Sequence, residues 1–186
     1  LLTDDVTRFT ALVEDLLEIS RYDVGTASLR AEPIDLVEFV RQSVDHSPYD
    51  VVIDVGALQY LVVAGDKRRL AQVVANLVDN AAKYGAGEIR VAVGQEDDFA
   101  IIAVEDEGPG VPEAERGVIF DRFSRGSAGG RRGHGTGSGL GLALVAEHVG
   151  LHGGDVWVDD RLDGSKGARF TVRIPIGDIP DEDEWA

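Results

Sequence analysis

The stretch Asn76-Leu-Val-Asp-Asn-Ala-Ala-Lys-Tyr84 lies in a helical pattern that starts after Asp66 and ends at Gly85. The buried stripe of this helix is predicted to consist of Leu70, Val73, Val74, Leu77 and Ala81. Four polar groups at i, i+4, i+7 and i+8 share the adjacent face: Asn76, Asn80, Lys83 and Tyr84. An amide oxygen suits a hard cation and an ammonium suits a phosphate, so this face is either a ligand site or a solvated surface.

A rigid turn follows the next pair of strand patterns, at Asp106-Glu-Gly-Pro-Gly-Val-Pro112. Two Gly and two Pro within seven residues let the backbone approach a ligand closely. In the functional interpretation, Asp106 accepts a hydrogen bond from an exocyclic amine of that ligand. The alternative is an ordinary turn with an acidic corner.

A glycine-rich loop, Gly133-His-Gly-Thr-Gly-Ser-Gly-Leu-Gly-Leu142, runs directly into a further helical pattern. Bare backbone N–H groups and the positive end of a helix form an anion site. A flexible linker is the alternative, but a linker does not usually continue into the apolar residues Leu140 and Leu142. No Gly-Lys-Ser/Thr follows, so the loop is not a Walker motif, and no strand precedes it as a dinucleotide fold requires.

The composition excludes several classes of protein. Among 186 residues, 34 Asp and Glu stand against 18 Lys and Arg, which gives a formal net charge of −16. Such a surface repels nucleic acid and anionic lipid, and the absence of Cys excludes disulfides and thiol catalysis. A polyanionic ligand therefore needs a locally positive site. The arginines beside the glycine loop supply one: Arg122, Arg125, Arg131 and Arg132. Phe120 and Phe123 are expected to attach this segment to the core.

The order of patterns predicts an α+β fold or a layered α/β sandwich. Helices are predicted over 35–45, 67–84, 113–116 and 139–152. Strands are predicted over 51–55, 60–64, 88–94, 99–105, 156–158 and 168–174. Four histidines, His46, His134, His148 and His152, are expected at the surface or in the loop. Residues 177–186 are predicted to be an unpacked acidic tail.

Residues 1–25 carry apolar residues at alternating steps of four and three, which is the coiled-coil period. This helix either packs on its own domain or pairs with a helix outside the chain. The chain starts with Leu inside a helical pattern, which favours a fragment of a longer protein. No apolar run approaches the roughly 20 residues of a membrane span.

The three motifs, their order and the phenylalanine-containing segment between the two glycine motifs resemble the ATP-binding domain of bacterial sensor histidine kinases. These belong to the superfamily of gyrase B, Hsp90 and MutL. The resemblance covers about residues 32–176, and the run Gly167 to Pro175 also matches. It implies a two-layer α/β sandwich of the Bergerat type, with a mixed, mostly antiparallel sheet covered by three helices. The implied division is an ATP-binding domain over 29–176, preceded over 1–25 by one coiled-coil-type helix of a dimerisation and phosphoacceptor module.

The resemblance also implies a role for each motif residue. Asn80 is expected to coordinate Mg²⁺, Asn76 to orient the metal or a phosphate, and Lys83 to contact phosphate. Tyr84 is expected to border the adenine, whose amine donates to Asp106, with room provided by Gly108 and Gly110. The phosphate loop is expected to comprise Gly137, Ser138, Gly139, Leu140 and Gly141. Residues 117–138 correspond to a mobile lid in which Arg125 faces the γ-phosphate; Arg125, Asn76 and Lys83 are the implied catalytic residues.

Two departures from the superfamily pattern matter. ATP-hydrolysing relatives carry a Glu one helical turn before the metal Asn, whereas Asn76 is an amide and cannot act as a base. None of the four histidines has the family's His-Glu-x-x-Thr-Pro context, so the acceptor is expected upstream. The implied function is ATP–Mg²⁺-dependent phosphoryl transfer to a histidine, relayed to a response regulator. The parent is expected to be a homodimeric inner-membrane sensor with this domain on the cytoplasmic face. A serine kinase of the anti-sigma-factor type and a non-catalytic nucleotide sensor are the alternatives.

Overall fold

The computed structural model describes residues 13, 28–45, 47–124 and 139–177. Its central element is a five-stranded sheet, in the spatial order β2 (Val51–Asp54), β4 (Ile89–Glu96), β5 (Phe99–Asp106), β7 (Ala168–Pro175) and β6 (Asp155–Asp159). Only β2 and β4 pair in parallel, and all other neighbours in this sheet are antiparallel. The mixed, mostly antiparallel sheet is therefore confirmed.

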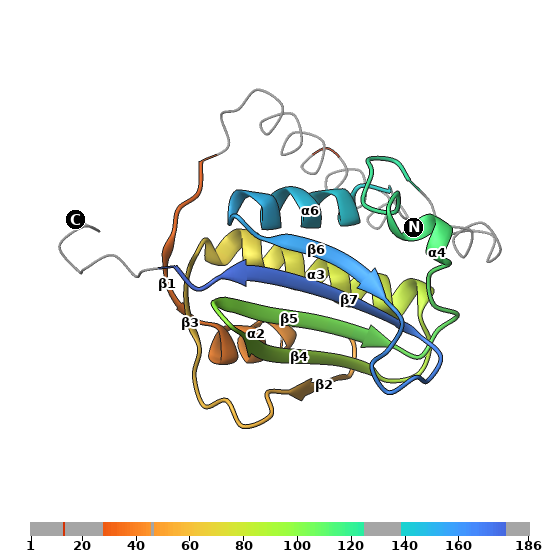
Figure 1. Ribbon diagram of the computed structural model, residues 1–186, viewed down its shortest axis with the longest axis horizontal. Coiled ribbons are helices and arrows are strands. Elements are labelled where there is room, and N and C mark those ends of the chain that lie inside the picture. Colours follow the sequence, from red (N-terminus) through yellow and green to blue (C-terminus); the bar gives the residue numbers. More distant parts are fainter. Residues whose placement is uncertain (1–12, 14–27, 46, 125–138, 178–186) are drawn as a thin grey trace.

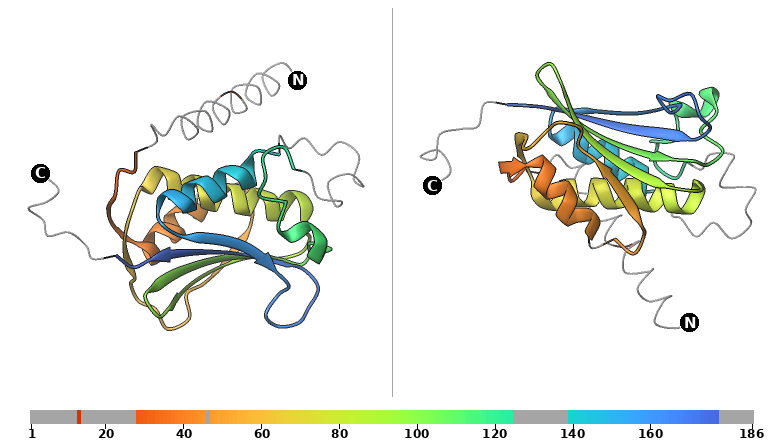
Figure 2. Two further views of the ribbon diagram at one scale, coloured as in Figure 1. Left: turned by 45° about the horizontal axis from the view of Figure 1, so that its top comes forward. Right: turned by 90° about the horizontal axis from the view of Figure 1, so that it is seen from below.

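Three helices cover one face of this sheet, α2 (Leu36–Asp45), α3 (Lys67–Tyr84) and α6 (Gly141–Leu151), as Figures 1 and 2 show. The core lies between the two layers, where Leu70 and Leu77 of α3 and Phe170 of β7 are buried. Burial of these side chains is the main favourable term in the stability of the fold. The predicted two-layer α/β sandwich is confirmed. None of the helices in the described part combines the length and hydrophobicity that a bilayer-spanning segment requires.

Local capping explains where the helices begin and end. The Asp66 carboxylate accepts a hydrogen bond from the Arg69 N–H at 3.1 Å, and the Gly85 N–H donates to the Ala81 carbonyl, so α3 has the predicted bounds. Helix α6 starts at Gly141 rather than at the predicted position 139, because Gly139 has a φ of +72°. The short helix α4 (Glu113–Arg116) is also confirmed.

One pair of strands was only half predicted. Strand β1 (Glu32–Asp35) pairs with β3 (Val62–Gly65) in a separate two-stranded sheet beside the main one. β1 is four residues long and contains Pro33, which disfavours a strand. Pairing with β3 therefore determines its conformation, and its own sequence does not reveal it.

Two histidines expected at the surface are buried, with exposures of 1% for His148 and 7% for His152. His148 Nδ1 lies 3.2 Å from Arg69 Nη1, and its Nε2 lies 3.2 Å from the Gln72 amide oxygen. His152 Nε2 accepts from the Asp66 N–H at 3.0 Å, while Nδ1 lies 2.7 Å from the His148 carbonyl oxygen. The expectation was wrong because the first turns of α3 supply polar partners to the end of α6.

This arrangement predicts a pH-dependent stability. Burial, the largest cause, lowers the pKa of His152 from 6.5, and its bond to His148 and the charge of Asp66 only partly oppose that. The unfolded chain therefore binds a proton that the folded chain excludes, so stability is lost as pH falls below about 6.5. Urea unfolding between about pH 8 and 5 should show that the free energy of unfolding of His152→Gln falls less steeply than that of the wild type. The contribution of His152 to the wild-type slope is at most about 1.4 kcal/mol per pH unit. Parallel curves for the two proteins would contradict this.

Candidate functional site

The polar face of α3 lies beside its buried stripe, as the spacing predicts. All five stripe residues are buried: Leu70, Val73, Val74, Leu77 and Ala81. Asn76, Asn80 and Tyr84 are half-buried, and Lys83 is exposed. A polar face that is mostly half-buried is not a plain solvated surface, which favours a ligand site.

Asn76 joins the α3 motif to the glycine loop. A Cβ placed on Gly141, the first residue of α6, would lie 3.5 Å from Asn76 Oδ1. Among the described residues, the Asn76 Nδ2 atom is buried and has no hydrogen-bond partner. A buried amide without a partner costs free energy, and an anionic ligand at the start of α6 would satisfy it.

Asp106 joins the second motif to the carboxyl end of α3. Its Oδ1 accepts a hydrogen bond from the Gly108 N–H at 2.7 Å. A Cβ on Gly85 would lie 2.6 Å from the Asp106 Cβ and Cγ, and a Cβ on Gly108 would lie 2.6 Å from the Gly85 Cα. Glycine is therefore required at both positions for the turn to approach the end of the helix this closely.

The Asp106 side chain is 4% exposed and can accept hydrogen bonds at the bottom of this turn. Burial raises the pKa of Asp106, and hydrogen bonds from the backbone N–H groups of Gly108 and Ala168 and the charge of Arg161 oppose that rise. A further hydrogen-bond donor at this position, such as an exocyclic amine, would add a bond to the charged form of the carboxylate.

The described end of the glycine loop is held by the phenylalanine segment. The Phe123 N–H donates to the Gly139 carbonyl at 3.0 Å, and a Cβ on Gly139 would lie 3.0 Å from the Phe123 Cα. Leu140 is buried and provides no side-chain cap for α6. The start of α6 thus keeps the positive end of its dipole directed at the Asn76 face.

Lys83 has a partner on its own helix. Its ammonium forms an ion pair with Asp79, and the Tyr49 hydroxyl donates to Asp79 Oδ1 at 3.0 Å. The contact with Asp79 is one helical turn back and partly exposed, and such pairs contribute little to stability. An anionic ligand at Lys83 would therefore displace only a weak partner.

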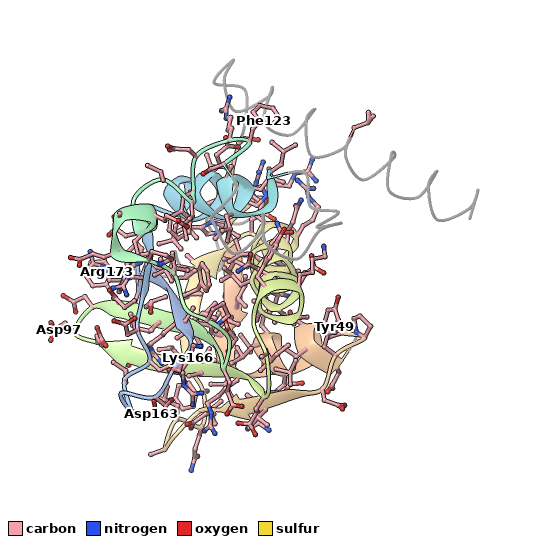
Figure 3. The ribbon with its side chains drawn as sticks, turned by 90° about the vertical axis from the view of Figure 1, so that its right-hand side faces the viewer. Tyr49, Asp97, Phe123, Asp163, Lys166 and Arg173 are labelled. Carbon is pink, nitrogen blue, oxygen red and sulfur yellow. The ribbon has the colours of Figure 1, made fainter. Side chains whose placement is uncertain are left out.

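The phenylalanine segment agrees with its prediction at Phe120 and differs from it at Phe123. Phe120 packs edge-on against Phe170 of β7, with ring centroids 6.4 Å apart, so it does attach the segment to the core. Phe123 is 66% exposed with a φ of +64°, and Figure 3 shows it beyond α6, away from the sheet. The Arg122 guanidinium is 2.9 Å from Glu147 of α6, so one arginine of the expected positive site pairs within the domain.

The structure brings together most of the candidate residues along α3. Asn76 meets Gly141 near the middle of the helix, and Asp106 and Gly108 meet Gly85 at its carboxyl end. Gly110 has a φ of +78° and packs against Gly167, whose carbonyl oxygen would lie 2.9 Å from a Cβ added at Gly110. Arg125, Gly137 and Ser138 lie outside the described residues, as do His134 and the predicted helix over 1–25 apart from Val13.

Supporting residues of the Asp106 turn were not predicted from the sequence. Gly85 is recognised only as a helix end, and Gly167 only as part of a terminal run, yet both contact Asp106. Arg161 is surrounded by acidic groups below the turn. These contacts join residues that are distant in sequence, and no local pattern marks them.

Comparison with known proteins supports the same assignment. Residues 65–178 match the family described as histidine kinase-, DNA gyrase B-, and HSP90-like ATPase. The chain is 36% identical over 184 residues to the signal transduction histidine-protein kinase AfsQ2 of Streptomyces coelicolor, a match that covers 99% of this chain and 34% of AfsQ2. The chain thus spans about a third of the length of this relative.

Two solved structures share the fold. The mycobacterial sensor histidine kinase MprB is 33% identical with a TM-score of 0.64, over 78% of this chain and 97% of that one. Full-length ShkA, solved in complex with AMPPNP, is 28% identical with a TM-score of 0.72, over 90% of this chain and 35% of ShkA. The chain therefore belongs to the histidine kinase-, DNA gyrase B- and HSP90-like ATPase family, as a histidine kinase ATP-binding catalytic domain.

Proposed function

We propose that residues 29–176 bind ATP along α3 and transfer its γ-phosphate to a histidine on a dimerisation helix. The observation that carries this is the placement of two motifs at the two ends of one helix face. Asn76, which lies near Gly141, is nine residues before Gly85, which lies near Asp106. At 1.5 Å per helical residue, this separation corresponds to roughly 13 Å. That is comparable to the length of an extended nucleoside triphosphate. AMPPNP, an ATP analogue, is bound by the related ShkA.

In this proposal the base lies at the Asp106 end. Asp106 accepts from the adenine N6 amine, and the bare backbones of Gly108 and Gly110 give the ring room. Tyr84, half-buried on the same helix face, borders the adenine. A nucleotide whose base carries a carbonyl instead of the amine would place two acceptors face to face, so the site selects adenine.

The phosphates lie at the Asn76 end. They are held there by the buried Nδ2 of Asn76, which has no partner among the described residues, and by the phosphate loop of Gly137, Ser138, Gly139, Leu140 and Gly141. Lys83 lies seven residues further along α3, next to the base end, and its long side chain contacts the phosphates from that side. Arg125 of the loop is the proposed cation for the γ-phosphate. Together they place positive charge and N–H donors around the one polyanion that this acidic chain binds.

The donor set fits Mg²⁺. Asn80 presents a hard amide oxygen on the same face, and no hydrogen bond or ion pair occupies its side chain among the described residues. The described residues contain no group of three His, Asp or Glu that would bind a metal without the nucleotide. Asn80 is therefore the proposed protein ligand, together with phosphate oxygens; the metal supplies neutralisation of phosphate charge.

Asn76 also bears on the reaction catalysed. Its amide stands one helical turn before Asn80, where a base would activate water, and an amide cannot accept that proton. A histidine imidazole is nucleophilic near neutral pH without such a base, so positioning and charge neutralisation suffice for transfer to it. We place that acceptor on the homodimer's own phosphoacceptor module, with residues 1–25 as its second helix. A response regulator is the next acceptor, and the domain lies on the cytoplasmic face of a membrane sensor.

The test is a transfer assay with residues 1–186 and a separately supplied acceptor domain that carries the family's His helix. We expect an acid-labile, base-stable phosphohistidine on the acceptor and negligible ATP hydrolysis in its absence. An acceptor in which that His is replaced by Gln is the matched control and should remain unlabelled. Sustained hydrolysis without acceptor, at rates typical of dedicated ATPases, would overturn the proposal.

A further inference from the structure

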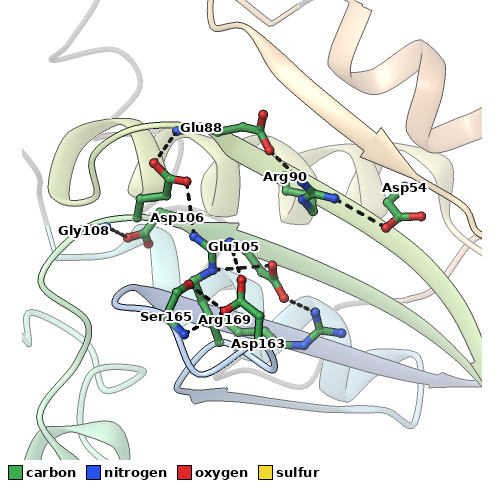
Figure 4. Close-up of polar contacts among 11 residues, drawn as sticks. Asp54, Glu88, Arg90, Glu105, Asp106, Gly108, Asp163, Ser165 and Arg169 are labelled. Atoms are coloured by element: carbon green, nitrogen blue, oxygen red, sulfur yellow. Dashed lines mark hydrogen bonds and ion pairs between the residues drawn. The ribbon is translucent and has the colours of Figure 1, made fainter.

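Arg161, in the loop between β6 and β7, is the centre of an ion-pair cluster at the end of the sheet that carries Asp106. Its side chain is 12% exposed. Its Nη2 donates to Asp163 Oδ2 at 3.1 Å, Nη1 lies 3.5 Å from Glu107 Oε1, and Nε lies 3.9 Å from Glu105 Oε2. Figure 4 shows the labelled acids Glu105 and Asp163 beside Asp106 in this cluster. The guanidinium thus contacts acids from β5, from the turn after it and from its own loop.

The same side chain packs against the backbone that supports Asp106. A Cβ on Gly167 would lie 2.7 Å from Arg161 Cδ and 1.9 Å from the Asp106 carbonyl oxygen. Gly167 is therefore enclosed between the Arg161 stem and the Asp106 backbone. Two of the three acids bound by Arg161, Glu105 and Glu107, are the chain neighbours of Asp106. Arg161 consequently restrains the residue before and the residue after the base-binding carboxylate.

The positive charge of Arg161 also acts on the Asp106 carboxyl group. Burial raises the pKa of Asp106, and the positive charge of Arg161 is the side-chain influence that opposes this rise. Arg169 of β7 provides a comparison, because it pairs with Glu105 but is not among the groups that shift the pKa of Asp106. The charged and titratable groups in the segments that meet at the turn are Lys83 and Tyr84 of α3, Glu88 before β4, Glu105 of β5, Glu107 of the turn, Arg161, Asp163 and Lys166 of the loop before β7, and Arg169 of β7.

We infer that Arg161 is a positioning residue for base selection: it holds the Asp106 turn from beneath and keeps a positive charge beside the carboxylate that receives the exocyclic amine. The inference rests on the proposed nucleotide site. It assigns part of the selectivity for adenine to a residue that does not touch the base. An ionised Asp106 accepts from an amine donor, whereas a protonated one loses that preference. Removal of the Arg161 charge should therefore weaken selection most at low pH.

The experiment measures the dissociation constants of ATP and of inosine triphosphate, which has a carbonyl in place of the amine, at about pH 6 and pH 8. It compares residues 1–186 with the variants Arg161→Gln, Arg161→Lys, Arg169→Gln and Asp106→Asn. The wild type should prefer ATP at least about 10-fold, the ratio expected for one charged hydrogen bond. Arg161→Gln should lose more of that preference at pH 6 than at pH 8, because loss of the positive charge raises the pKa of Asp106 further. Asp106→Asn should lack the preference at both values.

The remaining variants separate charge from packing. Arg161→Lys keeps the charge but not the planar fork, so ATP should bind about 3- to 10-fold more weakly with the pH dependence of the wild type. Arg169→Gln should have the ATP affinity of the wild type and the same pH dependence. Should Arg161→Gln fail to fold, as judged by its near-UV circular dichroism, Arg161→Lys with unchanged ATP affinity overturns the inference. If Arg161→Gln folds, two results would overturn the inference. One is an unchanged selectivity for ATP, and the other is a loss of selectivity equal to that of Arg169→Gln. Failure of the wild type to bind ATP would instead refute the proposed function.

Discussion

Replacement of Gly167 by alanine is expected to lower the free energy of unfolding by about 3 kcal/mol or more and to weaken ATP binding with it. A Cβ at this position would lie 1.9 Å from the Asp106 carbonyl oxygen, and the φ of Gly167 is +151°, a value that L side chains rarely adopt. Backbone atoms cannot rotate away as a side chain can, so β7 or the Asp106 turn must shift. Urea unfolding measures the first effect, and calorimetric titration with ATP measures the second.

Two other glycines serve as graded controls. Gly164, in the same loop, has a φ of +72° but nothing within 4 Å of an added Cβ, so Gly164→Ala should cost only the backbone strain of about 1 kcal/mol. Gly117 has a φ of −76° and open space, so Gly117→Ala should be neutral or slightly stabilising. Both should bind ATP as the wild type does. A Gly167→Ala protein with the stability of Gly164→Ala would show that the Asp106 turn is not tightly held.

The sequence predicted those parts of the fold that local patterns determine. The bounds of α3 follow from a capping Asp66, an apolar stripe and Gly85, and all three act within one helix. The hairpin of β4 and β5 likewise follows from an alternating run and a continuous apolar run on either side of a short polar turn. Motifs on such elements could be placed relative to one another because the resemblance supplied the fold.

The parts that were missed depend on partners distant in sequence. The burial of His148 depends on Arg69, which is 79 residues away, and that of His152 depends on Asp66, which is 86 residues away. Arg161 resembles any loop arginine until the acids of β5 are placed around it. Phe123 was expected to be in the core because it is apolar, yet its backbone is fixed by Gly139 and its ring is exposed. Composition and periodicity carry no information about such pairs.

The replacement of Asn80 by alanine is expected to reduce phosphoryl transfer to a supplied acceptor domain by at least about 100-fold, equivalent to about 2.7 kcal/mol of transition-state stabilisation. The reason is the loss of the proposed protein ligand for Mg²⁺. ATP binding should lose its dependence on Mg²⁺, whereas binding of ADP without metal should change little. Asn80 is half-buried and its side chain makes no hydrogen bond within the described residues, so the melting temperature should stay close to that of the wild type. Transfer rates and titrations with and without Mg²⁺ measure these effects.

Asn80→Asp is the matched variant, because it restores a hard oxygen ligand at the same distance from the backbone. It should recover a substantial part of the Mg²⁺-dependent binding that Asn80→Ala loses, since carboxylate and amide oxygens both coordinate this ion. Exposed Gln42 on α2 provides a control in Gln42→Ala, which removes an amide that bonds to Glu38 of its own helix and should leave transfer unchanged. If magnesium dependence survives in Asn80→Ala, the metal is held by other groups, and the polar face of α3 then serves the phosphates alone through Asn76 and Lys83.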